Sequence, residues 1–324
     1  MTSAEPKPRT RRFLRLGIIG LTLIAAAFVY RHFWLAKPVG TGPAGPGVPR
    51  AAFAETWISR PAVLLGIGDS VTAGLGSSRK ELSYFNRLVH NPVDESDDLK
   101  GICLSAVIPD LETKNIAVSG SNSIQHLAAI EGLEAFPDSV TGIVVMTTGG
   151  NDLIHWYGQT PPREGAMYGA TLAQAEPWIR NFEQRLTKML DLVQQKFPGG
   201  CEIFLGDIYD PSDGVGDAPS VFLPAWQDAM AIHSAYNAAI HRCAERGHVH
   251  LVPVHETFLG HGIHCTQFWR KHYRADDPHY WFYTNLEDPN DRGYDALRRI
   301  FLLKIAETFS AKGVPAPWIN PARR

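Results

Sequence analysis

Short apolar runs alternate with longer amphipathic stretches from about residue 61 to residue 310. Each run is bounded by Gly, Asp or Pro, as expected of parallel strands that are covered on both faces. The pattern predicts strands at residues 62–67, 115–118, 143–147, 202–208 and 250–254.

The stretches between these runs have the periodicity of helices. In one of them Trp178, Phe182, Leu186 and Met189 recur at helical spacing. Strands that alternate with helices form βαβ units, so the sequence predicts an α/β domain with a parallel sheet. The expected helices are residues 124–133, 177–197, 226–246 and 291–310.

The N-terminus has a different pattern. Residues 16–30 carry no charge, and a basic cluster precedes them: Lys7, Arg9, Arg11, Arg12 and Arg15. We expect residues 1–36 to form a basic cytoplasmic tail and a retained transmembrane helix, with the rest of the chain in the periplasm or outside the cell. A cleaved signal peptide and a secreted protein are the alternative.

Pro and Gly dominate residues 37–50, which predicts an extended, mobile linker over residues 37–60. The folded domain is expected at residues 61–312 and a C-terminal tail at residues 313–324. This division gives one domain on a membrane tether.

Composition narrows the classes of function. Hydrophobic residues make up 44% of the 324 residues, so a sizeable core can form. The net charge of -2 provides no basic excess for phosphates, and we expect no nucleic-acid partner. The cysteines have no metal-binding spacing, and could pair as Cys201–Cys243 and Cys103–Cys265 or remain buried free thiols.

Small or polar residues follow three of the predicted strands. Ser70 stands after the first strand at the opening of a helix, where backbone N–H groups favour negative charge. It is either a nucleophile or the residue that caps the helix. Gly120 follows the second strand and permits close approach of a ligand. Asn151 follows the third and offers an amide donor, although an ordinary turn has the same composition.

The chain reads G-D-S at residues 68–70, N-I-A-V-S-G at 115–120 and G-G-N-D at 149–152. In this order the segments resemble the motifs of the SGNH (GDSL-type) hydrolase family, over residues 62–310. The resemblance implies that Ser70 is the nucleophile, and that the amides of Ser70 and Gly120 and the side chain of Asn151 form an oxyanion hole. It also implies a three-layer, flavodoxin-like α/β/α sandwich without a metal or organic cofactor.

The last motif departs from the family pattern D-x-x-H. Asn285 stands at the position of the Asp and Asp288 at that of the His. A serine hydroxyl needs an adjacent base. Asp276 and His279 repeat the D-x-x-H spacing upstream, so we expect His279 to act as base and Asp276 or Asp288 to orient it. Alternatively Asp288 is itself the base, if burial raises its pKa, or the chain has no base.

The sequence therefore predicts a membrane-anchored serine hydrolase that cleaves carboxylic esters through an acyl-enzyme. Its substrate would be a lipid ester or an acylated envelope glycan, the latter by deacetylation. The alternative is a catalytically impaired protein of the same fold that binds lipid or glycan. The aromatic-rich insert at residues 262–286 would form a lid or platform at the site, or a satellite core beneath a long loop.

Overall fold

The computed structural model describes residues 8–310, and its centre is a five-stranded sheet in the order β2-β1-β3-β4-β5. Every pairing is parallel, so the carboxyl ends of all strands meet at one edge. The predicted α/β class is confirmed. The strands are β1 Ala62–Ile67, β2 Leu111–Asn115, β3 Thr141–Thr147, β4 Cys201–Gly206 and β5 Val249–Val252.

The second strand lies earlier in the chain than expected, at Leu111–Asn115 rather than at residues 115–118. It is an edge strand, and all of its residues except Leu111 are exposed. Such a strand needs no continuous apolar run, because solvent rather than a helix covers most of its surface. The apolar residues that we assigned to it follow the strand instead.

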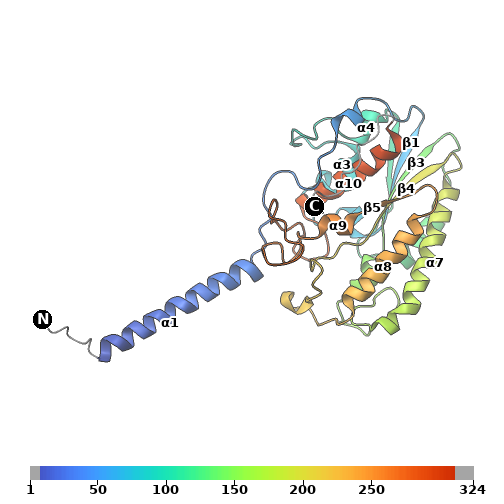
Figure 1. Cartoon of the computed structure of the whole chain (residues 1–324). Helices are drawn as coiled ribbons and strands as arrows, with labels where there is room; N and C mark the ends of the chain where they lie inside the picture. Colours follow the sequence, from blue (N-terminus) through green and yellow to red (C-terminus); the bar gives the residue numbers. More distant parts are fainter. Residues whose placement is uncertain (1–7, 311–324) are drawn as a thin grey trace.

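Helices cover both faces of the sheet (Figure 1). The side chains of α5, α7 and α8 pack on one face, and those of α3, α4, α9 and α10 pack on the other, which gives the expected three-layer sandwich. The helices are α1 Pro8–Tyr30, α2 Ser70–Ala73, α3 Tyr84–Val89, α4 Leu104–Val107, α5 Ser123–Glu131, α6 Gly150–Ile154, α7 Leu172–Lys196, α8 Ala229–Ala244, α9 Val254–Phe258 and α10 Asp291–Phe309. Short turns of other helix types are η1 Arg31–Leu35, η2 Arg50–Phe53, η3 Lys80–Leu82 and η4 Ala218–Val221.

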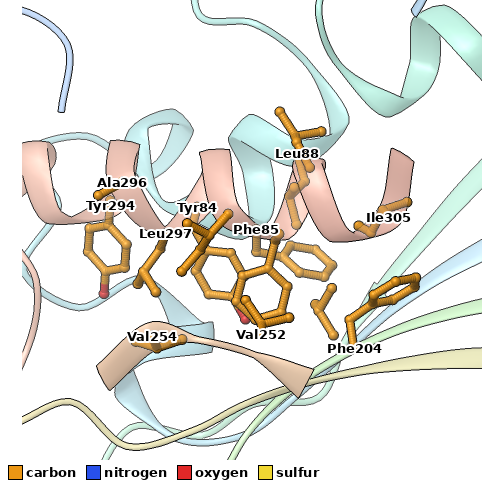
Figure 2. Packing of buried hydrophobic residues seen from close by; sticks show 14 of the residues in the cluster. Tyr84, Phe85, Leu88, Phe204, Val252, Val254, Tyr294, Ala296, Leu297 and Ile305 are labelled. Atoms are coloured by element: carbon orange, nitrogen blue, oxygen red, sulfur yellow. The ribbon is translucent and has the colours of Figure 1, made fainter. Parts of the chain in front are cut away.

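The last helix, α10, is held on the sheet by aromatic and aliphatic side chains (Figure 2). Tyr84 of α3 lies beneath α10 and stacks on Phe301, with ring centroids 5.0 Å apart. Both side chains are fully buried, and burial of a side chain of this kind contributes about 1.5–3 kcal/mol. Tyr84 also stacks on Tyr294, at 6.5 Å between ring centroids, so this packing holds the first turn of α10 that follows the altered last motif.

α10 also carries a buried network of ion pairs, which we call the paired cluster: Arg87, Glu95, Asp295, Arg298 and Arg299. Arg298 donates to Asp295 at 2.6 Å and to Glu95 at 3.0 Å, and it has no exposed surface. Each carboxylate contacts a guanidinium, which offsets the cost of taking both charges out of water. The cluster ties the segment after α3 to α10.

Residues 37–60, which we expected to be mobile, are packed against the domain. The N–H of Ala44 donates to the Asp295 carboxylate at 3.0 Å. Gly45 has a φ of +87°, and a Cβ there would lie 2.8 Å from the Cα of Ala296. Glycine is therefore used in this segment for close contact between backbones and not for flexibility.

The helix α1 projects away from the domain (Figure 1). Residues 13–35 of α1 and η1 are apolar and long enough to cross a membrane, and none of the apolar window is buried. This agrees with either a signal sequence or an anchor. Residues 1–7 and 311–324, which include the expected C-terminal tail, lie outside the described residues.

The four cysteines are buried free thiols, so the pairings Cys201–Cys243 and Cys103–Cys265 are wrong. Burial, together with the neighbouring charge of Glu202, raises the pKa of Cys201 to about 12. The thiols therefore behave as small core side chains.

Candidate active site

Ser70 begins the short helix α2, directly after β1. The turn requires Gly68, because a Cβ there would lie 2.5 Å from the carbonyl oxygen of Thr147. Asp69 caps the helix, since its carboxylate accepts a hydrogen bond from the N–H of Val71 at 3.1 Å. Ser70 is therefore not the cap, and its hydroxyl is available for chemistry.

Hydrogen bonds join the second and third polar segments to the first. The hydroxyl of Ser121 donates to the carbonyl of Gly68 at 3.3 Å, and the Asn151 side chain donates to the carbonyl of Ser121 at 2.9 Å. An amide NH₂ has two hydrogens, so one N–H of Asn151 remains for a ligand. Within the described chain, the backbone N–H groups of Ser70 and Gly120 have no acceptor. Each of the three donors that the resemblance assigns to an oxyanion hole thus has an unused hydrogen.

Asp288 is the carboxylate that approaches Ser70. It has no exposed surface, and its Oδ2 accepts a hydrogen bond from Nδ2 of Asn285 at 2.6 Å. Oδ1 of Asp288 has no hydrogen-bond partner among the described residues, and the nearby Ser70 side chain lowers the pKa of Asp288. Catalytic hydrogen bonds are often long before a substrate is bound.

Burial controls the ionisation of Asp69 and Asp288, which we call the unpaired carboxyls. Burial raises the pKa of Asp69 to about 7, against the hydrogen bond from Val71, and the charge of Asp288 adds to the increase. Burial also raises the pKa of Asp288, against hydrogen bonds from Ser70 and Asn285. Neither carboxyl forms an ion pair with a cation of the described residues. A carboxylate with a raised pKa is a stronger base than an exposed one.

A cavity of about 180 Å³ opens beside Ser70, and Asp69 and Asn151 also line it. Most of its other walls come from α6, from the segment after β4 and from the start of α8. These walls are largely apolar: Ile154, Tyr157, Ile208, Val221, Leu223, Trp226 and Met230. An apolar cavity beside a nucleophile suits the apolar part of a substrate, which gains about 25 cal/mol per Å² on burial.

His279 and Asp276 are placed away from this cavity, and neither lines it. Nδ1 of His279 lies 2.5 Å from Asp277, whereas Asp276 is exposed to solvent. Asp277 in turn accepts hydrogen bonds from Arg292 through both carboxylate oxygens, at 2.6 and 2.7 Å. A Cβ on Gly40 would lie 2.6 Å from the His279 ring, so this histidine packs against the docked linker.

The chain belongs to the GDSL-like lipase/acylhydrolase family, whose sequence pattern matches residues 67–296. An extracellular lipase from Streptomyces rimosus has a similar fold, with a TM-score of 0.51 and 16% identity over 75% of this chain and 99% of the lipase. An acetyl xylan esterase from Geobacillus stearothermophilus gives a TM-score of 0.49 and 17% identity over 79% of this chain and 98% of the esterase. No curated protein sequence matches the chain.

Two features of the site were missed in the sequence. The walls of the cavity include Val221, Leu223 and Trp226, which lie in a segment after β4 to which we assigned no role from the sequence. The apolar residues there were the signal that could have indicated a binding surface. The second feature is the donation from Asn285 to Asp288, which only the folded loop brings within 2.6 Å.

Some residues of the aromatic insert at residues 262–286 are buried in the core, and others are exposed to solvent. Tyr280, Trp281 and Phe282 are buried in the core, as a satellite core would require. Phe268 and Trp269 are exposed, and neither lines the cavity. A lid over the cavity is therefore not formed by these rings.

Proposed function

We propose that the protein is a serine hydrolase of carboxylic esters in which Ser70 is the nucleophile and Asp288 is its base. The observation that carries this proposal is the burial of Asp288 beside Ser70 without a cation, which raises the pKa of the carboxyl. A base of raised pKa at the hydroxyl is what a serine nucleophile requires near neutral pH.

The reaction would proceed through an acyl-enzyme. Oγ of Ser70 attacks the ester carbonyl carbon as its proton passes to Asp288. The amides of Ser70 and Gly120 and the side chain of Asn151 donate to the oxyanion. Asp288 then gives the proton to the departing alcohol. Water attacks the acyl group with Asp288 again as base, which releases the acid and restores Ser70.

Asn285 would orient Asp288 in the way that the family's Asp orients its His, with donor and acceptor exchanged. The usual His is a donor, so an acceptor is needed beside it. Here Asp288 is an acceptor, and the Asn285 amide donates to it at 2.6 Å. A carboxylate at position 285 would instead repel the charge on Asp288. The replacements at positions 285 and 288 are therefore chemically compatible, since the new acceptor at 288 has a new donor at 285.

The cavity favours an acyl group longer than acetyl. Its walls are largely apolar, and each CH₂ group buried against them contributes about 0.8 kcal/mol to binding. An acetyl group has no CH₂ to bury, so it gains little binding energy there. We therefore favour a lipid-like ester over an acetylated glycan as substrate. Hydrolysis of an acetylated glycan alone would reverse this preference.

We also infer that α1 is a retained anchor that holds the domain on the extracytoplasmic side of a membrane. The basic cluster of residues 7–15, which precedes the uncharged run at residues 16–30, favours a cytoplasmic N-terminal side. The chain contacts the domain from His32 onwards, where the carbonyl of His32 accepts from Thr266 at 3.3 Å. Residues that follow α1 are thus part of the fold, as suits a helix that remains attached.

The test is hydrolysis of p-nitrophenyl esters from acetate to decanoate by the full chain in detergent. We expect the parent to prefer chains longer than acetate, Ser70→Ala to be inactive, and Asn151→Ala to lose roughly 10²–10³ in kcat. His279→Ala serves as the control that should stay within a few-fold of the parent. An inactive parent that still binds fatty acids would make the ligand-binding alternative the better account.

A further inference from the structure

The chain that leaves α1 is joined to the insert by aromatic contacts. Phe33 lies 4.7 Å from Trp269 and 5.9 Å from Phe268, and Trp34 lies 5.8 Å from Trp269, measured between ring centroids. The side chain of Gln267, which is fully buried, donates to the carbonyl of Phe33 at 2.9 Å. We call Phe33, Trp34, Phe268 and Trp269 the aromatic collar.

Much of the aromatic collar faces outwards. Phe268 is 64% exposed, Trp269 46% and Trp34 36%. Neighbouring exposed rings of this size are uncommon on a surface that only water contacts, and indicate an interaction site. The rings are also fixed in place, since Gln267 and Thr266 bond to the backbone of the same turn.

The position of the aromatic collar along the apolar helix identifies what would cover it. The apolar segment Phe13–Leu35 has 23 residues. A hydrocarbon core about 30 Å thick takes up about 20 helical residues, so a span that begins near Phe13 leaves the hydrocarbon near His32. The collar then lies at the level of the lipid headgroups, where Trp and other aromatic residues are enriched.

We propose that the aromatic collar is a membrane-interface site, and that Phe268 and Trp269 form a second contact with the bilayer that α1 enters. This proposal rests on the proposed anchor but not on the proposed chemistry. The occupant is the headgroup layer of the lipid surface, because Phe33 and Trp34 of the collar belong to the apolar segment Phe13–Leu35, and Phe33 contacts the rings of the insert.

The contact has a consequence for orientation. A single helix followed by a free linker would let the domain rotate over the membrane, whereas a second contact fixes one face towards it. The insert that supplies Phe268 and Trp269 also supplies Ile263 and Leu286 to the cavity wall. The domain would therefore be held with this loop, and the cavity edge it borders, close to the lipid surface.

The test is depth-dependent quenching on the full chain in phosphatidylcholine–phosphatidylglycerol vesicles. A single cysteine is introduced by Phe268→Cys and labelled with a nitrobenzoxadiazole dye. The native cysteines are all buried, and the labelled parent gives the blank. Val93→Cys is the matched control, because Val93 is fully exposed on the segment after α3. Lys271→Cys is a second reporter in case Phe268→Cys does not fold.

We expect the dye at position 268 to lose about half or more of its fluorescence to headgroup nitroxide lipids, and less to nitroxides deep in the acyl chains. The dye at position 93 should lose almost none. Equal, negligible quenching at positions 268, 271 and 93 in vesicles that carry the protein would overturn the proposal. Flotation with the vesicles and an intact mass are measured first, since a chain that does not float would overturn the anchor itself.

Discussion

The domain holds two groups of buried carboxylates, and they differ in what neutralises them. In the paired cluster, Glu95 and Asp295 contact the guanidinium groups of Arg87, Arg298 and Arg299. The unpaired carboxyls, Asp69 and Asp288, receive hydrogen bonds from neutral groups only.

The difference appears in the direction of the pKa shifts. Burial alone would raise the pKa of Glu95, but the hydrogen bond and charge of Arg298, with the charge of Arg87, lower it to about 2. Burial raises the pKa of Asp69 to about 7 and also raises that of Asp288. The arginines thus keep Glu95 ionised, whereas burial without a cation favours the protonated form of Asp69 and Asp288. This difference is expected between structural and functional carboxyl groups.

The largest expected effect is on activity, from Asp288→Asn. Removal of a general base costs about 10²–10⁴ in rate, whereas loss of a buried charge that lacks a cation should leave the stability of the fold unchanged or improve it. Rates on p-nitrophenyl butyrate and urea unfolding of the same samples measure both. A variant that keeps the parent's rate would remove Asp288 from the mechanism.

The converse change is Glu95→Gln in the paired cluster. Arg298 would keep Asp295 but lose the charge of Glu95, and breaking a buried pair costs up to about 3–5 kcal/mol of unfolding free energy. The rate of the folded fraction should remain near that of the parent. Unchanged stability in urea would contradict the role given to the network.

The pH dependence of stability should have opposite signs in the two groups. Asp69 is protonated in the folded state up to about pH 7, so its contribution is present below the unfolded pKa near 3.8 and is lost as pH rises through 7. Glu95, with its lowered pKa, contributes above 4.5 and loses its contribution as pH falls towards 2. Asp69→Asn keeps a good helix cap and should reduce the decline between pH 4 and pH 7 by the contribution of Asp69.

That decline is measured as the free energy of unfolding in urea at several pH values for the parent and Asp69→Asn. The expected difference is at most about 4 kcal/mol, from 1.36 kcal/mol per pKa unit. Identical slopes in the two proteins would show that Asp69 is not the group that titrates.

The smallest effect is expected from Asn285→Asp, which places a second carboxyl beside Asp288 in a side chain of nearly the same shape. A second carboxyl beside Asp288 should raise the pKa of Asp288 further and move the activity profile upwards by about one pH unit. Asn181→Asp is the matched control, because Asn181 also donates to a carboxylate, at 3.0 Å, but is exposed on α7. Coincident profiles for the parent and Asn285→Asp would exclude Asn285 as the positioning residue.

Much of the fold follows from the sequence because the central strands are buried on both faces. β1, β3 and β4 are continuous apolar runs, and their positions are confirmed to within two residues. β2 was misplaced because an exposed edge strand carries polar residues. The docked linker was mistaken for a mobile one because Gly45 serves contact with α10, a purpose that composition does not reveal.

The candidate site was predictable where residues follow strand ends, as Ser70, Gly120 and Asn151 do. The base was harder to predict from the sequence. The spacing of Asp276 and His279 matches the family motif, but His279 packs against Gly40 of the linker and pairs with Asp277. The features that support Asp288 as the proposed base, its burial and its hydrogen bond from Asn285, are shown only by the folded chain.

The central claim is that Asp288 is the base for Ser70, and the most direct measurement is the rate of fluorophosphonate labelling against pH. The parent should label at Ser70, with a rate that rises through a single ionisation above the normal range of an aspartic acid. Asp288→Asn should label at least about 100-fold more slowly near neutral pH and lose that rise. Labelling of Asp288→Asn at the parent's rate, with the same pH profile, would contradict the account.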